Sequence, residues 1–97
     1  MENFDSFYKF YLDEHKNKVN IALHYLGTTI SLSLIIIFII QAKYVLILPA
    51  FLLGYVFAWV GHFVFEKNKP AAFKYPVMSF LSDLKLWLTI TKKFLNK

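Results

Sequence analysis

The sequence predicts an all-α membrane protein, in which a transmembrane helical hairpin is flanked by N- and C-terminal helices that are amphipathic or partly embedded. The composition is 58% hydrophobic, and the mean hydropathy is +0.49. Two apolar runs each have about the 20 residues that a helix needs to cross the hydrocarbon. A chain of 97 residues forms one domain at most, so we expect a single integral membrane domain over residues 1–97.

The first expected element is an amphipathic helix over about residues 3–16. Its apolar residues recur at helical spacing, and its charged residues fall on the other side. The apolar side contains Phe4, Phe7, Tyr8, Tyr11, Leu12 and His15. Asn3 is a suitable N-cap, and Asn20 is the expected N-cap of the next helix. A helix with one apolar stripe should lie on a membrane surface and not cross it.

The two crossing helices are expected over about residues 21–40 and 44–66. The first run is apolar except for His24 and small hydroxyl residues. The second contains Pro49 and Gly54, which membrane helices tolerate when their neighbours satisfy the freed backbone groups. Residues 41–43 form a short turn between the two runs, so the pair is predicted to fold back as a hairpin.

The distribution of lysines predicts the orientation of the hairpin. Lysines flank its two open ends at Lys9, Lys16, Lys18, Lys67, Lys69 and Lys74, whereas the turn has only Lys43. Positively charged residues accumulate on the cytoplasmic side of membrane proteins. Both termini should therefore be cytoplasmic, at the inner membrane in a bacterium or at the endoplasmic reticulum in a eukaryote.

The last expected element is a helix over about residues 76–94. One face has an apolar stripe made of Val77, Phe80, Leu81, Leu84 and Leu88. Asp83 and Lys85 near the middle would make a membrane crossing costly. This helix should therefore lie on the membrane surface or be partly embedded in it.

The composition also excludes several functions. The chain has no cysteine, which rules out disulfides, thiolate metal sites and cysteine nucleophiles. The net charge is +5, but the lysines gather at the edges of apolar segments and form no basic stripe with aromatic residues to read bases. We therefore expect no nucleic-acid partner, and anionic headgroups explain the charge better.

The only three histidines fall where the predicted fold can bring them together. In an antiparallel hairpin, His24 lies about one turn inside the first crossing helix and His62 about one turn before the end of the second, so they share a depth. His15 is on the apolar side of a helix at the same boundary. Glu66 is four residues after His62, on the same helical face. Three imidazoles and one carboxylate can therefore converge.

This convergence predicts a metal site. Ionisable groups near the hydrocarbon are costly and usually functional, and imidazole is well suited to bind a metal at neutral pH. Three other interpretations stay open. Histidines at a membrane boundary can simply bond to headgroups or water in a non-catalytic scaffold protein. Two facing histidines can clamp a haem in an electron-transfer module, and the ligand type alone does not separate iron from a hydrolytic zinc.

The sequence resembles a known family through a set of short motifs. These are Glu14-His15, Asn20, Leu23-His24 with Gly27, Gly61-His62, Phe65-Glu66 and Pro70-Ala71. The block GHxxFExxxPA over residues 61–71 is the most specific of them, and the likeness runs over nearly the whole chain. On these motifs the chain resembles the membrane family of yeast-type 2-hydroxy fatty acid dioxygenases.

This resemblance implies an iron(II) enzyme that performs α-oxidation of 2-hydroxy fatty acids, consuming dioxygen and shortening the chain by one carbon. The family's iron-binding histidines correspond to His15, His24 and His62, and Glu66 would be a further ligand or would orient an imidazole. The implied partners are a 2-hydroxy fatty acid, dioxygen and membrane lipid, with Fe(2+) as cofactor. The chain departs from many short relatives at Tyr75, where they have a histidine.

Three further residues are candidates for substrate contact. Lys67 and Lys69 could draw an anionic head toward the metal, although lysines at helix ends also snorkel to phosphates. Trp59 could line a slot for lipid, although an interfacial aromatic belt explains it as well. Two crossing helices bury little surface against each other, which makes a homodimer an option.

Overall fold

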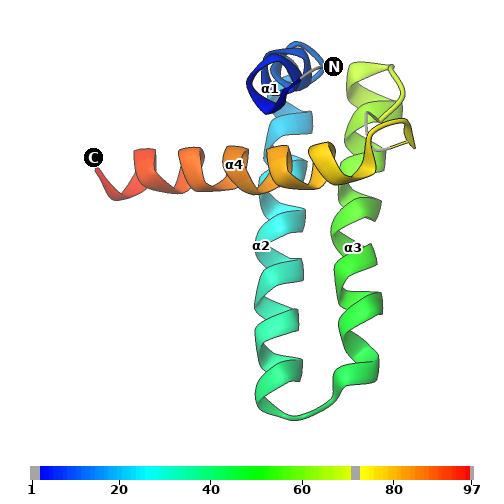
Figure 1. The fold of residues 1–97 in the computed structure, drawn as a ribbon, viewed down its shortest axis with the longest axis vertical. Helices are drawn as coiled ribbons and strands as arrows, with labels where there is room; N and C mark the ends of the chain where they lie inside the picture. The colour runs from blue at the N-terminus through cyan, green and yellow to red at the C-terminus, as the bar shows by residue number, and fades with distance from the viewer. Residues whose placement is uncertain (1–2, 71–72, 97) are drawn as a thin grey trace.

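The computed structural model describes residues 3–70 and 73–96, and these residues are almost entirely helical (Figure 1). The elements are α1 (Phe4–Asp13), α2 (Lys18–Ile40), η1 (Tyr44–Leu46), α3 (Ile47–Val60), η2 (Gly61–Glu66) and α4 (Pro76–Leu95). No strand occurs in the described ranges, so the prediction of an all-α chain is confirmed. Ala71, part of the predicted Pro70-Ala71 motif, lies outside the described residues.

Within the described residues, two stretches are long and apolar enough to cross a membrane by length and composition. They are Lys18–Ile40 and Tyr44–Glu66, each 23 residues long. Figure 1 shows that α2 and α3 run side by side in opposite directions. Helix α1 lies over the end where α2 begins and α3 finishes, and α4 runs across the pair next to α1. All four helices therefore meet at one end, and the turn over residues 41–43 projects at the other.

Helices α1 and α2 are both capped by asparagine side chains. Asn3 Oδ1 accepts from the Ser6 N–H at 2.8 Å, as predicted. Asn17 caps α2, because its side chain accepts from the N–H groups of Val19 at 2.9 Å and Asn20 at 3.3 Å. The expectation that Asn20 is the cap is therefore wrong. Asn17 has the extended backbone of a cap, whereas Asn20 is already inside the helix and fully buried.

Small residues let α2 and α3 approach closely. A Cβ atom on Gly27 would lie 2.6 Å from Phe57 Cβ, and one on Gly54 would lie 3.2 Å from Ser31 Cβ. The Ser31 hydroxyl donates across the interface to the carbonyl of Ala50 at 2.9 Å. Small residues spaced by four and interhelical hydroxyl bonds are typical of helix pairs in lipid.

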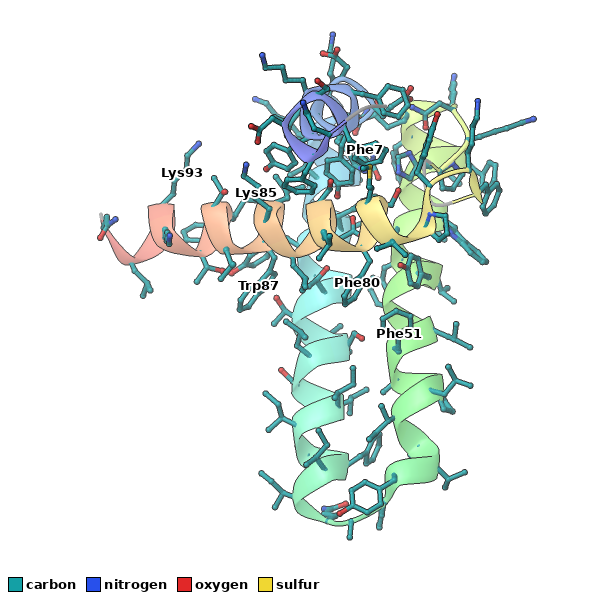
Figure 2. The ribbon with its side chains drawn as sticks, viewed as in Figure 1. Phe7, Phe51, Phe80, Lys85, Trp87 and Lys93 are labelled. Atoms are coloured by element: carbon teal, nitrogen blue, oxygen red, sulfur yellow. The ribbon has the colours of Figure 1, made fainter. Side chains whose placement is uncertain are left out.

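A compact aromatic core holds α1 against α4 at the crowded end. Phe7, Tyr11 and Leu86 are buried together there. Figure 2 labels Phe7 beside α4 and Trp87 on its opposite side. Trp87 Nε1–H donates to Thr29 Oγ1 on α2 at 2.8 Å, which also fastens α4 to the helix pair. Helix α4 is therefore fastened both to α1 and to the helix pair.

The distribution of polar and apolar side chains differs from that of a typical water-soluble protein, because many polar side chains are buried and many large apolar side chains are exposed. Many of the buried side chains at the crowded end are polar, including three histidines, an asparagine and two serines. The projecting half of the helix pair exposes large aliphatic residues to its surroundings (Figure 2). They include Ile36, Ile37, Ile39, Ile40, Val45, Leu48, Leu52 and Val56.

Candidate metal centre

The three histidines come together although they belong to three different elements. His15 lies in the segment between α1 and α2, His24 in the second turn of α2, and His62 in the π-helical turn η2. They are only 4%, 6% and 2% exposed, respectively. One ring nitrogen from each lies within 4.8 Å of the others, and the ring centroids are 4.4, 4.5 and 5.0 Å apart.

Each imidazole is held in place by an oxygen that accepts a hydrogen bond from its Nδ1–H. The pairs are His15 with the Tyr11 carbonyl at 2.6 Å, His24 with the Asn20 carbonyl at 3.0 Å, and His62 with Asn68 Oδ1 at 2.7 Å. Because an oxygen of this kind can only accept, the proton of each neutral ring must be on Nδ1. This leaves three Nε2 atoms with free lone pairs.

These lone pairs fit a metal ion. His15 Nε2 and His24 Nε2 are 3.0 Å apart, and with both protons on Nδ1 no hydrogen lies between the two nitrogens. Such a contact is repulsive unless a cation occupies the space. Two ligands that bind a metal at about 2.1 Å and at a right angle are themselves about 3.0 Å apart. Neutral imidazoles suit iron, zinc, copper and nickel. The donor set therefore fits a transition metal.

Burial keeps His15 in the form that binds metal. Desolvation lowers the pKa of His15 from 6.5 to about 4, although the hydrogen bond to the Tyr11 carbonyl partly opposes it. The Tyr11 ring also stacks on the imidazole, with 3.9 Å between centroids. At neutral pH the His15 ring is therefore uncharged, and its orientation is fixed on two sides.

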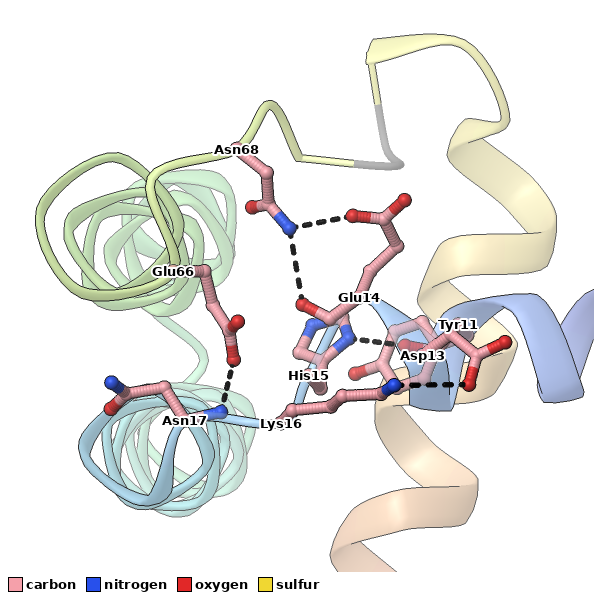
Figure 3. A network of polar contacts seen from close by, with 8 residues as sticks. All are labelled: Tyr11, Asp13, Glu14, His15, Lys16, Asn17, Glu66 and Asn68. Atoms are coloured by element: carbon pink, nitrogen blue, oxygen red, sulfur yellow. Dashed lines mark hydrogen bonds and ion pairs between the residues drawn. The ribbon is translucent and has the colours of Figure 1, made fainter.

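Asn68 is a functional residue that the sequence reasoning missed. Lys67 adopts a left-handed conformation with φ of 60° and ends η2, so the chain turns back and places Asn68 against His62. The Asn68 Nδ2 group donates to Glu14 Oε2 at 2.5 Å and to the Glu14 carbonyl at 3.3 Å (Figure 3). These bonds define which end of the amide faces His62. The only sequence signal was an asparagine six residues after that histidine.

Glu66 lies outside the converging donor set and joins the start of α2 to η2. Its Oε1 accepts from the Asn17 N–H at 2.5 Å (Figure 3) and from Asn20 Nδ2 at 3.3 Å. A Cβ atom on Gly61 would be 1.9 Å from Asn20 Oδ1, so only glycine allows this approach. Because the Asn20 carbonyl holds His24, Glu66 acts on the site through Asn20.

The remaining candidate residues take different places. Trp59 lines the small cavity beside the histidines, which also contains Ser79 and Asp83 from α4. Lys67 and Lys69 are exposed on the loop after η2. Tyr75 packs edge-on against Phe7, with 5.4 Å between centroids, so in this chain that position belongs to the aromatic core.

The comparison with protein families covers nearly the whole chain. Residues 1–95 match the family described as 2-hydroxy-palmitic acid dioxygenase Mpo1-like, a range that includes all three histidines. No curated protein and no solved structure gives a significant match. The resemblance predicted from the motifs is confirmed, and the chain belongs to the Mpo1-like family.

Proposed function

We propose that the protein is an iron(II)-dependent membrane dioxygenase that shortens 2-hydroxy fatty acids by one carbon through α-oxidation. The observation that supports it most is the meeting of three buried imidazoles, each held at Nδ1 by an oxygen, with one ring nitrogen from each within 4.8 Å of the others. The family name supplies the oxidative direction and the class of substrate. His15, His24 and His62 would hold the iron.

The exposed apolar surface supports a membrane location for this enzyme. Only 17% of the apolar window of each long helical stretch is buried, whereas the core helix of a soluble protein is mostly buried. We infer that α2 and α3 cross the membrane as a hairpin and that α1 and α4 lie at one boundary. The lysine distribution supports a cytoplasmic location for that boundary and for both termini. A homodimer stays a prediction.

The proposed reaction balances without an added reductant. A 2-hydroxy acid and dioxygen give the acid one carbon shorter, carbon dioxide and water, and the bond between the first and second carbons breaks. Bound iron(II) would activate dioxygen while the substrate supplies the electrons overall, and a set of three protein ligands would leave positions open for both. The substrate carboxylate would stay at headgroup level, near the exposed Lys67 and Lys69.

The alternative of a haem clamp fits the geometry poorly. Two axial histidines must stand on opposite faces of a porphyrin. The 3.0 Å contact between His15 Nε2 and His24 Nε2 leaves no room for such a plate. A purified protein without a Soret band would agree with this conclusion.

The direct test is anaerobic purification, iron loading and incubation with 2-hydroxypalmitate in the presence of dioxygen. We expect one iron per chain, consumption of dioxygen, and formation of the acid one carbon shorter. Zinc-loaded protein should bind substrate without shortening it. The variant His62→Ala should lose metal but keep its helical content and membrane insertion. Iron-loaded wild-type protein that forms no shortened acid would refute the proposed activity.

A further inference from the structure

An apolar groove extends from the histidine pocket along the helix pair. The small cavity at the histidines and the larger groove share four lining residues, His24, Tyr55, Ala58 and Asp83. Beyond them the wall of the groove is mostly apolar, apart from the hydroxyl residues Thr28 and Ser31, and is formed by α2, α3 and α4. The polar cavity at the histidines therefore adjoins an apolar groove, an arrangement that suits a molecule with a polar head and a long apolar tail.

The length of the groove matches one leaflet of a bilayer. Along α2 its wall runs from His24 through Leu32 to Ile35. Eleven residues of helix rise about 16 Å, at roughly 1.5 Å each. This is about half of the roughly 30 Å hydrocarbon core, which two opposed layers of lipid tails fill. Phe51 on α3 and Phe80 on α4 both line the groove and pack against each other, with 5.4 Å between ring centroids (Figure 2).

The polar end of the groove contains a hydroxyl that has no partner. Ser79 is 3% exposed, lines the cavity at the histidines, and its Oγ makes no hydrogen bond among the described residues. An unpaired polar group in a buried place is costly unless a ligand completes it. Asp83, one turn further along α4, lines the same cavity and accepts a hydrogen bond from the Tyr11 hydroxyl.

We propose that this groove binds the acyl tail of the substrate, that Ile35 at its far end limits the tail length, and that Ser79 and Asp83 bind the polar head. The inference rests on the proposed function and adds the position of the substrate. Ser79 would donate to the carboxylate, and Asp83 would accept from the 2-hydroxyl, which an unsubstituted fatty acid lacks. Burial raises the pKa of Asp83 to about 7, which weakens its repulsion of a substrate carboxylate.

The tail is tested with a matched pair of variants on neighbouring isoleucines. Ile35→Trp fills the far end of the groove, whereas Ile36→Trp adds the same ring on a face that is 57% exposed. Binding is measured by calorimetry on zinc-loaded protein, so that no turnover occurs. We expect Ile35→Trp to lower the affinity for 2-hydroxypalmitate by about tenfold or more, because several methylene groups of the tail are then no longer buried. The same variant should bind 2-hydroxydecanoate as tightly as the wild type does. Ile36→Trp should bind both acids with wild-type affinity.

The head is tested with a second matched pair. Ser79 and Ser82 are both buried on α4 with unpaired hydroxyls, but only Ser79 lines the cavity. Ser79→Ala should lower the affinity for 2-hydroxypalmitate by about tenfold, which is the loss expected when a hydrogen bond to a charged group is removed. Ser82→Ala should leave the affinity unchanged. Because neither hydroxyl has a partner within the described residues, both variants should fold as the wild type does.

The outcomes separate this inference from the proposed activity. Equal affinities for the two tryptophan variants would overturn the groove assignment, and equal affinities for the two alanine variants would overturn the head assignment. Both could occur while iron-loaded protein still shortens the acid. Conversely, protein that shows the expected affinities but never shortens the acid would support the binding site and refute the activity.

Discussion

At the scale of single residues, three hydrogen-bond acceptors orient the three histidines so that they can act together as metal ligands. A histidine near lipid is ambiguous by itself, because its ring can bond through either nitrogen. Here each ring donates a hydrogen bond from Nδ1–H. The acceptors are the Tyr11 carbonyl, the Asn20 carbonyl and the Asn68 side chain. These contacts stiffen the rings before any metal arrives, which reduces the conformational entropy lost on binding.

Removing the acceptor of His62 should weaken metal binding without removing a ligand. We expect Asn68→Ala to lower metal affinity by about 10- to 100-fold, because the imidazole loses the partner that orients it. Asn68→Asp should restore much of the affinity, since a carboxylate oxygen accepts the same bond. Competition with a chelating dye measures both values. Lys69→Ala, on the exposed part of the same loop, is the control, and an Asn68→Ala protein with wild-type affinity would disprove the orienting role.

The protonation of Asp83 should respond to Tyr11. Burial raises the pKa of Asp83 to about 7, and the hydrogen bond from Tyr11 opposes that rise. Tyr11→Phe should therefore move the titration to still higher pH. Infrared spectroscopy measures the absorption band of the protonated Asp83 carboxyl as a function of pH. The Asp83→Asn variant lacks this carboxyl and should therefore lack the band. A titration midpoint that stays the same or falls in Tyr11→Phe would contradict this assignment.

The same shift has a consequence for stability. Between pH of about 4 and 7 the folded protein keeps a proton on Asp83 that the unfolded chain has lost. The free energy of unfolding of the wild type should therefore fall as pH rises through this window, relative to Asp83→Asn, and level off above pH of about 7. Unfolding in detergent at several pH values measures the difference. A difference that is constant with pH would show that Asp83 titrates normally.

The sequence predicted which histidines meet but not what holds them. Helical periodicity and the hairpin were enough to place His24 and His62 at one depth. The acceptors could not be predicted, because Asn68 reaches His62 only through the left-handed backbone at Lys67. Ser79 likewise gives no signal, since a serine on a helix is most often simply exposed or packed.

At the scale of elements, the π-helical turn η2 shapes the site. Helical periodicity predicted one continuous helix to residue 66, but the structure changes from α3 to η2 at Gly61. A π-helical turn inserts extra backbone into a helix and often marks a functional site. Such a change in winding leaves no periodic pattern in a run of apolar residues. The predicted start of α2, near residue 21, was also wrong. Asn17 and Asn20 are equally good caps by residue type, so the sequence did not distinguish between them.

Gly61 should be intolerant of a side chain, and Asn20 should be the reason. The Cβ atom of Gly61→Ala would overlap Asn20 Oδ1, so the helices must separate and His62 must move. We expect at least a tenfold loss of metal affinity. Asn20→Ala removes the overlapping atoms, so the double variant should recover part of that loss, a non-additivity that a double-mutant cycle measures. Strictly additive effects would rule out the proposed contact as the cause.

At the scale of the whole molecule, the polar interior and the apolar exterior require each other. The buried histidines and Asn20, with two of the buried serines, lie at one end, where α1 and α4 close over the helix pair. The other end presents exposed aliphatic side chains, a pattern that favours lipid surroundings. In the proposed membrane position, a metal bound at this end would lie between the polar head of the substrate and the hydrocarbon that holds its tail.

This placement predicts which parts of the chain face each side of a membrane. The chain has no cysteine, so single cysteines can be introduced one at a time and labelled with a membrane-impermeant maleimide. Lys43→Cys, in the turn, should react from the outside of intact cells or right-side-out vesicles. Lys16→Cys, at the crowded end, should react only after the membrane is opened, because positively charged ends stay in the cytoplasm.

Ile36→Cys supplies the control for depth, because its side chain is exposed in the structure and yet should face lipid. It should resist the maleimide in intact and opened membranes, and react once detergent and denaturant expose it. Reaction of Ile36→Cys from water in an intact membrane would mean that the aliphatic surface is not embedded. Labelling of Lys16→Cys and Lys43→Cys from the same side would reject the hairpin, because an odd number of crossings must separate them.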